Sequence, residues 1–271
     1  MITAIPRIAI AVRNFGVAVA TFRDVFGMPV VDHSDRTVPS LGAHVGMCVP
    51  EGGSNIELMA PADATKPLSQ ALQKFLDRRD EGPYALMLEA PDPDAEAVLL
   101  AERGLDVLPL MAGAGGRDVH PHSTHGVLVR VYPDDSAPAG DARHSRPPGL
   151  SGIVKVIVAT ADASLATTAY GQGFGLDVGP VIDDEERGVR CVECYPPKGG
   201  MIELVSAVDT SRPFASAIQR FVKDENGGMY ALVLSADDPE RAAAHLADHG
   251  VTTRDGTPPE ATTFGARFLI A

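Results

Sequence analysis

Three short segments in the first half of the chain alternate between apolar and polar residues, which is the pattern of half-buried β-strands. In each segment, aliphatic side chains occupy one face and a single charged residue lies on the other face. The charged residues are Arg7 in "RIAIAV", Glu57 in "NIELM" and Arg130 in "VLVRVY". We expect the aliphatic faces to pack against helices and the charged faces to line one common cavity.

Apolar residues at helical spacing lie between these strands. Residues 14–27 predict a helix that begins after Asn14 as its N-cap and ends at Gly27. Its apolar stripe consists of Phe15, Val19, Phe22 and Phe26. A shorter helix is predicted by Leu68, Ala71, Leu72 and Phe75. Residues 94–104 predict a third helix, so each helix is preceded and followed by strands.

The second half of the chain repeats the first. "EGPYALMLEA" recurs as "NGGMYALVLSA", and identical residues recur at a constant offset of 146 positions. The pairs are Glu57/Glu203, Pro67/Pro213, Phe75/Phe221, Gly82/Gly228, Tyr84/Tyr230, Asp92/Asp238 and Gly104/Gly250. A fixed offset over this length indicates a duplicated domain. We therefore expect domains at 1–133 and 151–271, joined by a linker rich in Pro, Gly and Ala over 134–150.

Composition narrows the class of protein. The 271 residues suffice for two domains, and 45% hydrophobic with 22% charged residues is typical of a globular protein. The formal net charge of −13 argues against nucleic-acid binding, which needs a basic face. No apolar run is long enough to span a membrane, and the N-terminus lacks a signal-peptide pattern. Because three cysteines cannot all pair within the chain, we expect a cytoplasmic protein.

Several segments carry a resemblance to a known family: "RIAIAV", "FRDVFGMPV", "NIELMAP", "KPLSQALQKFLDRRDEG" and "HPHSTHGVLVRV". They resemble the vicinal oxygen chelate superfamily of glyoxalases, methylmalonyl-CoA epimerases, bleomycin-resistance proteins and extradiol dioxygenases, and within it the epimerases most. The resemblance implies an α+β fold with two tandem domains, each of two βαβββ units forming an open β-barrel groove. Because the duplication can replace pairing between two chains, it is consistent with a monomer or a homodimer. The fold alone leaves the reaction open.

The resemblance also implies where a metal would be held. In that family, one side chain from each of four strands binds a divalent metal, typically His or Gln, Glu or Gln, His, and Glu. The matching positions are Arg7, Glu57, Ala85 and Arg130 in the first copy, and Lys155, Glu203, Ala231 and Leu269 in the second. One carboxylate remains in each copy, and the neighbouring cations repel a divalent metal. We therefore predict no metal and no other cofactor in either groove.

Two interpretations of the first groove remain open. Glu57 between Arg7 and Arg130 can form a buried ion triad that replaces the lost metal site. Alternatively, the net positive charge of these residues suits an anionic ligand held by the arginines beside Tyr132. In the second groove the lysine and the glutamate cancel, so we expect that groove to be structural.

Other candidate groups are histidines and cysteines. His120 and His122 lie in "DVHPHSTHG", where both imidazoles can reach a ligand, or where they can serve a turn like the His-Pro-x-Ser-Thr turn of the epimerases. Cys191 and Cys194 lie on a predicted strand, where side chains three residues apart face opposite sides. We therefore expect neither a zinc site nor a redox motif from this pair.

These residues support two functional hypotheses. The first is a metal-independent isomerase, epimerase or lyase that acts on a small organic acid or acyl-thioester in the first groove. In it Glu57 carries the proton, Arg130 stabilises negative charge, and His122 is a further catalytic residue. The ligand-binding residues are Arg7, His120 and Tyr132. The alternative is a non-catalytic protein that binds and sequesters a small molecule, as antibiotic-resistance relatives do, and a structural or regulatory module is a third hypothesis.

Overall fold

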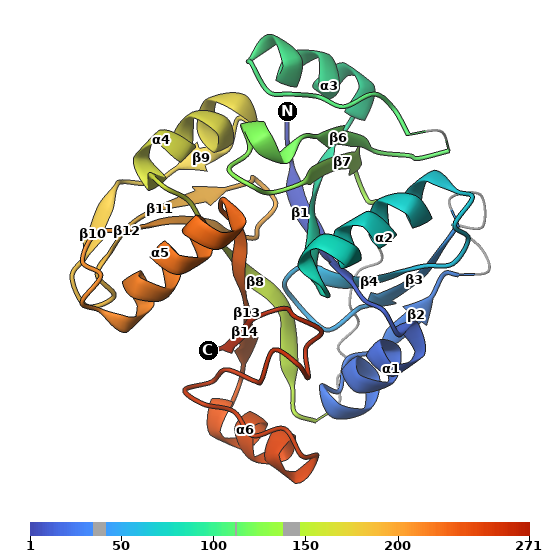
Figure 1. Cartoon of the computed structure of the whole chain (residues 1–271), viewed down its shortest axis with the longest axis vertical. Coiled ribbons are helices and arrows are strands. Elements are labelled where there is room, and N and C mark those ends of the chain that lie inside the picture. The colour runs from blue at the N-terminus through green and yellow to red at the C-terminus, as the bar shows by residue number, and fades with distance from the viewer. Residues whose placement is uncertain (35–41, 112, 138–146) are drawn as a thin grey trace.

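The computed structural model describes residues 1–34, 42–111, 113–137 and 147–271. It contains two mixed β-sheets, and each half of the chain builds one of them (Figure 1). The strand order is β2-β3-β4-β1-β5-β7-β6 in the first sheet and β10-β11-β12-β8-β13-β14 in the second, with β9 paired to β11. The α+β class and the tandem arrangement expected from the repeat are confirmed. Of the expected linker over 134–150, residues 138–146 lie outside the described residues.

The elements of the first half follow the expected order. They are β1 (Ala4–Ala11), α1 (Phe15–Ala20), the π-helical turn η1 (Thr21–Val25), β2 (Val30–Asp32), β3 (Ala43–Cys48), β4 (Asn55–Pro61), α2 (Pro67–Arg79), β5 (Gly82–Ala90), α3 (Pro93–Glu102), β6 (Arg117–Val119), the 3₁₀ turn η2 (Pro121–Ser123) and β7 (Val129–Pro133). The N-cap and stop of the first helix are as expected. The Asn14 side chain accepts a hydrogen bond from the Val17 N–H at 3.1 Å, and Gly27 has a φ of +68°.

The second half repeats this order with shorter pieces. Its elements are β8 (Leu150–Ala159), α4 (Ala163–Thr167), the π-helical turn η4 (Thr168–Gly173), β9 (Asp177–Val178), β10 (Ile182–Asp184), β11 (Val189–Tyr195), β12 (Ile202–Ala207), α5 (Pro213–Glu225), β13 (Gly228–Ala236), α6 (Pro239–Asp248) and β14 (Phe268–Ile270). Among the described residues, β6 and β7 follow α3, whereas β14 alone follows α6. Neither sheet closes into a barrel.

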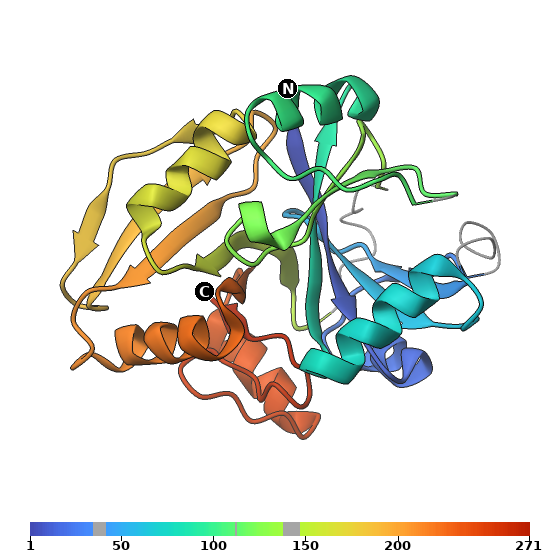
Figure 2. The same cartoon turned by 45° about the horizontal axis from the view of Figure 1, so that its top comes forward.

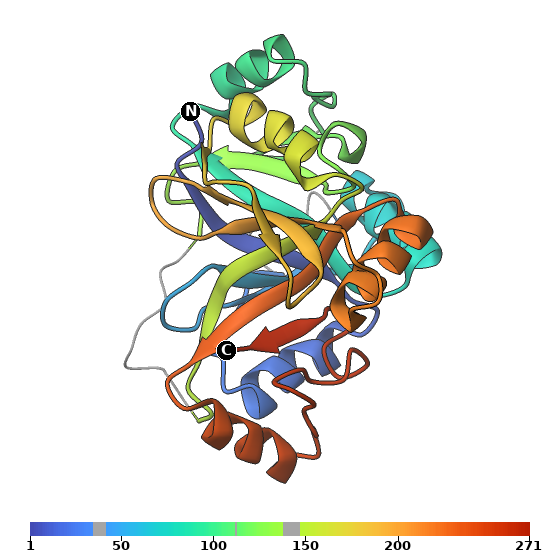
Figure 3. The same ribbon diagram turned by 90° about the vertical axis from the view of Figure 1, so that its left-hand side faces the viewer.

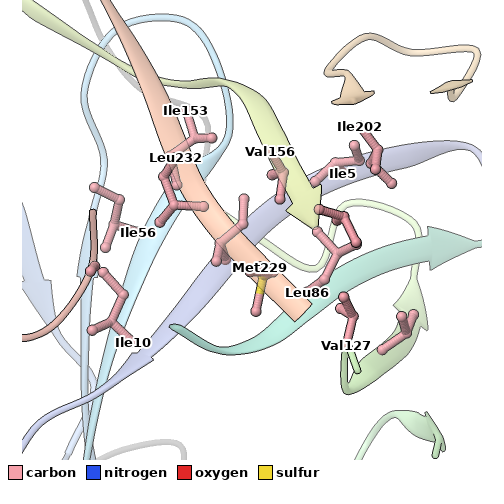
Figure 4. Packing of buried hydrophobic residues seen from close by; sticks show 14 of the residues in the cluster. Ile5, Ile10, Ile56, Leu86, Val127, Ile153, Val156, Ile202, Met229 and Leu232 are labelled. Carbon is pink, nitrogen blue, oxygen red and sulfur yellow. The ribbon is translucent and has the colours of Figure 1, made fainter. Parts of the chain in front are cut away.

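The aliphatic faces of the two sheets share one hydrophobic core. Ile10, Ile56 and Leu86 of the first sheet belong to the same buried cluster as Val156 and Leu232 of the second (Figure 4). The expectation that the aliphatic faces pack against helices is confirmed, because residues of η1 and α4 belong to this cluster as well. One core across both sheets means that the two copies stabilise each other.

Aromatic rings extend this core across the two copies. Phe22 of η1 lies 6.2 Å from Phe264 and 6.0 Å from Phe268, measured between ring centroids. Phe26, which follows η1, lies 6.5 Å from Phe268. These distances fall in the range of favourable aromatic pairs. The first helix of one copy therefore packs against the last strand of the other.

The opposite face of each sheet is covered by a single helix. We call this the inner face; it carries Arg7, Glu57 and Arg130 in the first sheet, and Lys155 and Glu203 in the second. Helix α2 packs on the first inner face and α5 on the second (Figure 3). Small residues of the strands allow this close packing. They are Ala9, Ala11 and Ala85 under α2, and Ala159 and Ala231 under α5.

Two glycine turns join the copies reciprocally. Gly126, ahead of β7, lies against Gly227, and a Cβ at Gly126 would lie 2.5 Å from the Gly227 carbonyl. Gly265, ahead of β14, lies against Glu81, and a Cβ there would overlap the Glu81 carbonyl oxygen. Both glycines have positive φ, +88° and +72° respectively. The same close approach therefore occurs on both sides of an approximate two-fold axis.

We expect Gly265→Ala to destabilise the fold more than Gly104→Ala. Both glycines have positive φ, but a Cβ at Gly104 meets nothing within 4 Å, so that variant carries only backbone strain. Gly265→Ala adds a clash with backbone, and we expect its extra loss of unfolding free energy to be about 2 kcal/mol or more. Urea denaturation measures both losses. Equal losses would show that the two copies do not approach closely at this turn.

Candidate functional site

The first candidate group lies on the inner face of the first sheet. The Arg7 Nε donates to a carboxylate oxygen of Glu57 at 3.1 Å, and its guanidinium lies 4.3 Å from the ring centroid of Tyr132. Arg7 also donates to the Ser136 Oγ at 2.8 Å. Only 5% of the Arg7 side chain and 9% of the Glu57 side chain are exposed. The structure thus brings three of the predicted residues together as a buried group whose charges are already paired.

Arg130 forms a separate pair with Asp118, so the ion triad with Glu57, one of the two interpretations of this groove, does not form. Its guanidinium forms a bidentate pair with Asp118 of the adjacent strand β6. Nε donates to Oδ1, and Nη2 donates to Oδ2 at 2.6 Å. Burial lowers the pKa of Arg130, but the hydrogen bond to Asp118 and the electrostatic interactions with Tyr132, Asp118 and Tyr84 together outweigh burial and leave the pKa above its ordinary value. Sequence reasoning missed Asp118. The only signal was its place opposite Arg130 in a β-hairpin of very short strands.

The inner face of the second sheet carries a more open charge group. The Lys155 Nζ lies 3.8 Å from a Glu203 carboxylate oxygen, as the expected cancellation requires. Glu203 has a closer partner in Arg187, whose Nη2 donates at 2.7 Å, and Arg187 also pairs with Asp184 at 2.6 Å. The side chains of Lys155 and Arg187 are 27% and 32% exposed. Sequence reasoning missed Arg187, which lies in the turn between β10 and β11.

Neither inner face has the donor set of a divalent metal site. Where the superfamily would use a metal-binding side chain, Ala85 and Ala231 are buried under α2 and α5. The single carboxylate of each face is already bound by a guanidinium. Within the described residues, no group of three or more His, Cys, Asp or Glu side chains is arranged to hold a metal ion. These residues do not fit the metal that the superfamily resemblance implies.

The cysteines lie as the strand pattern predicts. Cys191 belongs to the cluster under α5, whereas Cys194 belongs to the core between the sheets. The two thiols therefore lie on opposite faces of β11 and are free.

The C-terminal ends of α2 and α5 approach each other (Figure 2). A cavity of about 780 Å³ lies there, between the two copies. Its apolar wall consists of Phe75, Tyr84, Leu128, Phe221, Met229 and Tyr230. The rings of Phe75 and Tyr84 form an edge-to-face pair at 5.2 Å, and those of Phe221 and Tyr230 form the equivalent pair at 5.4 Å. The repeated Phe and Tyr thus supply matching halves of one cavity.

Ion pairs close parts of this cavity. Arg79 of α2 pairs with the Glu225 carboxylate of α5 at 3.1 Å and donates to the Glu225 backbone carbonyl at 2.6 Å. Arg267 pairs with Glu260 at 2.5 Å and lies 4.2 Å from the ring centroid of Tyr230. The first pair ties the two helix ends together, and the second covers one aromatic wall. Residues of both copies therefore line the cavity, and these ion pairs stabilise its walls.

His120 and His122 line this cavity and lie outside the Arg7–Glu57 group. The His120 Nδ1 accepts a hydrogen bond from the His122 backbone N–H at 3.1 Å, which caps η2. His120 therefore serves the turn, which is one of the two roles that the sequence left open. His125 lies at the contact between the copies, where its Nδ1 is 3.0 Å from the Thr160 Oγ1. Burial lowers the pKa of His125, which favours its neutral form there.

Comparison with known proteins agrees with this architecture. Residues 7–120 match the profile of the Glyoxalase/Bleomycin resistance protein/Dioxygenase superfamily. A triple mutant of 4-hydroxymandelate synthase from Streptomyces coelicolor is similar in structure, with a TM-score of 0.66 and 18% identity over 96% of this chain and 78% of that one. At 17% identity, a xylose isomerase-like TIM barrel/4-hydroxyphenylpyruvate dioxygenase fusion protein matches 93% of this chain and 39% of its own, with a TM-score of 0.58.

A variant of Streptomyces coelicolor methylmalonyl-CoA epimerase, in complex with 2-nitronate-propionyl-CoA, matches 51% of this chain and 99% of its own, with 23% identity and a TM-score of 0.42. No curated protein sequence matches the chain. At these identities the structural similarities concern the fold alone. Within the described residues, no helix has both the length and the hydrophobicity needed to cross a membrane.

We expect Arg130→Met to destabilise the fold by about 3–5 kcal/mol, because it leaves the Asp118 carboxylate under the sheet edge without its partner. The double variant Arg130→Met/Asp118→Leu removes both charges and should recover most of this loss. Urea denaturation of the two variants and the wild type measures the difference. A single variant as stable as the wild type would show that this pair does not support the fold.

Proposed function

Starting from residues 7–120, which belong to the Glyoxalase/Bleomycin resistance protein/Dioxygenase superfamily, we propose that the chain binds a small molecule, without a metal, in the cavity between its two copies. The observation that carries this proposal is the cavity itself. Its volume of about 780 Å³ lies within the range of about 300–1,000 Å³ that is usual for small-molecule sites. Its position between two copies and its aromatic walls are also typical of such sites.

The proposal moves the ligand away from the inner face of the first sheet. There Arg7 and Glu57 are bound to each other, Arg130 is bound to Asp118, and α2 covers the strands. A ligand that bound these charged groups would have to break buried ion pairs. We therefore assign Arg7, Glu57 and Arg130 to the support of the fold.

A second candidate function is catalysis by an isomerase, epimerase or lyase in the same cavity. It is favoured by His122, whose imidazole lies at the cavity wall and is the side chain best suited to move a proton near neutral pH. In this version His122 takes the role of proton carrier that the sequence suggested for Glu57.

We expect Ala71→Trp to abolish binding of a small apolar probe, because Ala71 of α2 lines the cavity and an indole would fill it. The probe is the neutral fluorophore N-phenyl-1-naphthylamine, followed by its fluorescence in titrations with and without EDTA. The matched control is Ala217→Trp, which makes the same change at the equivalent position of α5, outside the residues that line the cavity.

Wild type and Ala217→Trp should bind the probe alike, with or without EDTA, whereas Ala71→Trp should weaken binding by at least about tenfold. Melting curves of all three proteins establish that they are folded. Failure of the wild type to bind, or equal loss in both tryptophan variants, would contradict the proposed site. Loss of binding in EDTA would contradict its independence of metal.

Solvent exchange distinguishes binding from catalysis. Mass spectrometry identifies the ligand that copurifies with the chain, and this ligand is then incubated with the protein in D₂O. A binding protein should leave it free of deuterium beyond the protein-free control. Deuterium uptake that His122→Gln abolishes, while the ligand still binds, would establish the second candidate instead.

A further inference from the structure

The basic residues without an acidic partner among the described residues lie on one wall of the cavity. The basic residues that line it are Lys74, Arg78, Arg79 and Arg267, and the acidic ones are Glu81, Glu225 and Glu260. As described above, Arg79 and Arg267 are already paired with the glutamates at 225 and 260. The Glu81 carboxylate accepts a hydrogen bond from the Arg13 backbone N–H at 2.6 Å. The basic residues that remain belong to one wall, which is α2.

Lys74 and Arg78 lie one helical turn apart on α2, so their side chains lie on the same side of the helix. Both are exposed, and no ion pair joins either of them to another residue of the described chain. Asp77, the acidic residue between them, accepts a hydrogen bond from Gln73 at 2.8 Å. Two neighbouring cations without partners repel each other, and an anion between them would relieve that repulsion.

The apolar wall lies beside these cations. Phe75 follows Lys74 directly and forms the edge-to-face pair with Tyr84. No hydrogen bond joins the Tyr84 hydroxyl to another described residue. Burial raises the pKa of Tyr84, so its hydroxyl keeps its proton at neutral pH. Cations and an aromatic surface thus lie together on the side of the cavity that the first copy builds.

The equivalent surface of the second copy does not line the cavity. The position matching Lys74 is Arg220, and the position matching Arg78 is Asp224. Neither residue lies in the cavity wall. The cation pair therefore faces the cavity from one side only, although the aromatic walls are duplicated.

We infer that the ligand is an organic anion with an apolar, ring-containing body. Its charged group, a carboxylate or a sulfonate, lies at Lys74 and Arg78, and its body lies between the aromatic pairs of the two copies. This inference rests on the proposed function, because it names the class of ligand for the same cavity. It adds that affinity depends on the ligand's negative charge.

Two probes with the same ring system test this dependence. 8-Anilinonaphthalene-1-sulfonate carries one negative charge, whereas N-phenyl-1-naphthylamine has the same body without the sulfonate. We expect the wild type to bind the sulfonate at least about tenfold more tightly. The variant Lys74→Glu/Arg78→Glu should weaken binding of the sulfonate by at least about tenfold and change binding of the neutral probe by less than about twofold.

The matched control is Arg220→Glu/Lys223→Glu, which makes the same change of charge on the exposed side of α5, outside the cavity wall. It should leave the affinity for both probes unchanged, and Ala71→Trp should block both. Melting curves confirm that each variant is folded. Sulfonate binding that Ala71→Trp does not block would overturn the inference, because the probe would then lie elsewhere.

The outcomes separate the two proposals. If neither probe binds the wild type, the proposed function is wrong. If both bind equally well, or if charge reversal on α2 and on α5 weakens the sulfonate alike, the cavity binds small molecules but the inference about anions is wrong. Selective loss of the sulfonate in the α2 variant alone supports the inference.

Discussion

The packing of α2 and α5 on the inner faces of the two sheets is the constraint on which the rest of the structure depends. A helix can lie this close to a sheet only where the strands carry small residues, and Ala9, Ala85 and Ala231 are such residues. Leu72 and Ile218 then fill the space against the strands. The helices thus occupy part of the space that an open groove would offer to a ligand. The cavity of about 780 Å³ lies beyond the helix ends, where the two copies meet.

The same constraint explains the buried charges. A lone buried guanidinium would lose its hydration without compensation, so each buried arginine of the first sheet needs a carboxylate within hydrogen-bonding distance. Glu57 supplies it for Arg7, and Asp118 supplies it for Arg130. Such pairs add little stability in themselves, but removing one partner strands the other. They are therefore better suited to holding neighbouring strands in register than to releasing and accepting protons in a reaction.

The fold was predictable from the sequence because its signals are local or repeated. The alternation in residues 7–12 and the constant offset between copies can both be read from the sequence without knowledge of tertiary contacts. The partners of the charged residues were not predictable in the same way. Asp118 lies on a strand of three residues, too short for alternation to show its face, and Arg187 reaches Glu203 from a turn. The cavity was also missed, because it depends on how the copies dock through the glycine turns at Gly126 and Gly265.

Differences between the copies at the cavity have a structural consequence. The glycines and aromatic rings that shape it are the same in both copies, which gives the cavity its approximate two-fold form. The polar positions differ, since Leu128 of the first copy corresponds to Arg267 of the second, and Arg78 corresponds to Asp224. A symmetric cavity between identical copies would present the same groups twice and accept a ligand in two equivalent orientations. Because the duplicated halves are joined in one chain, their sequences can differ, and the cavity between them has two different ends.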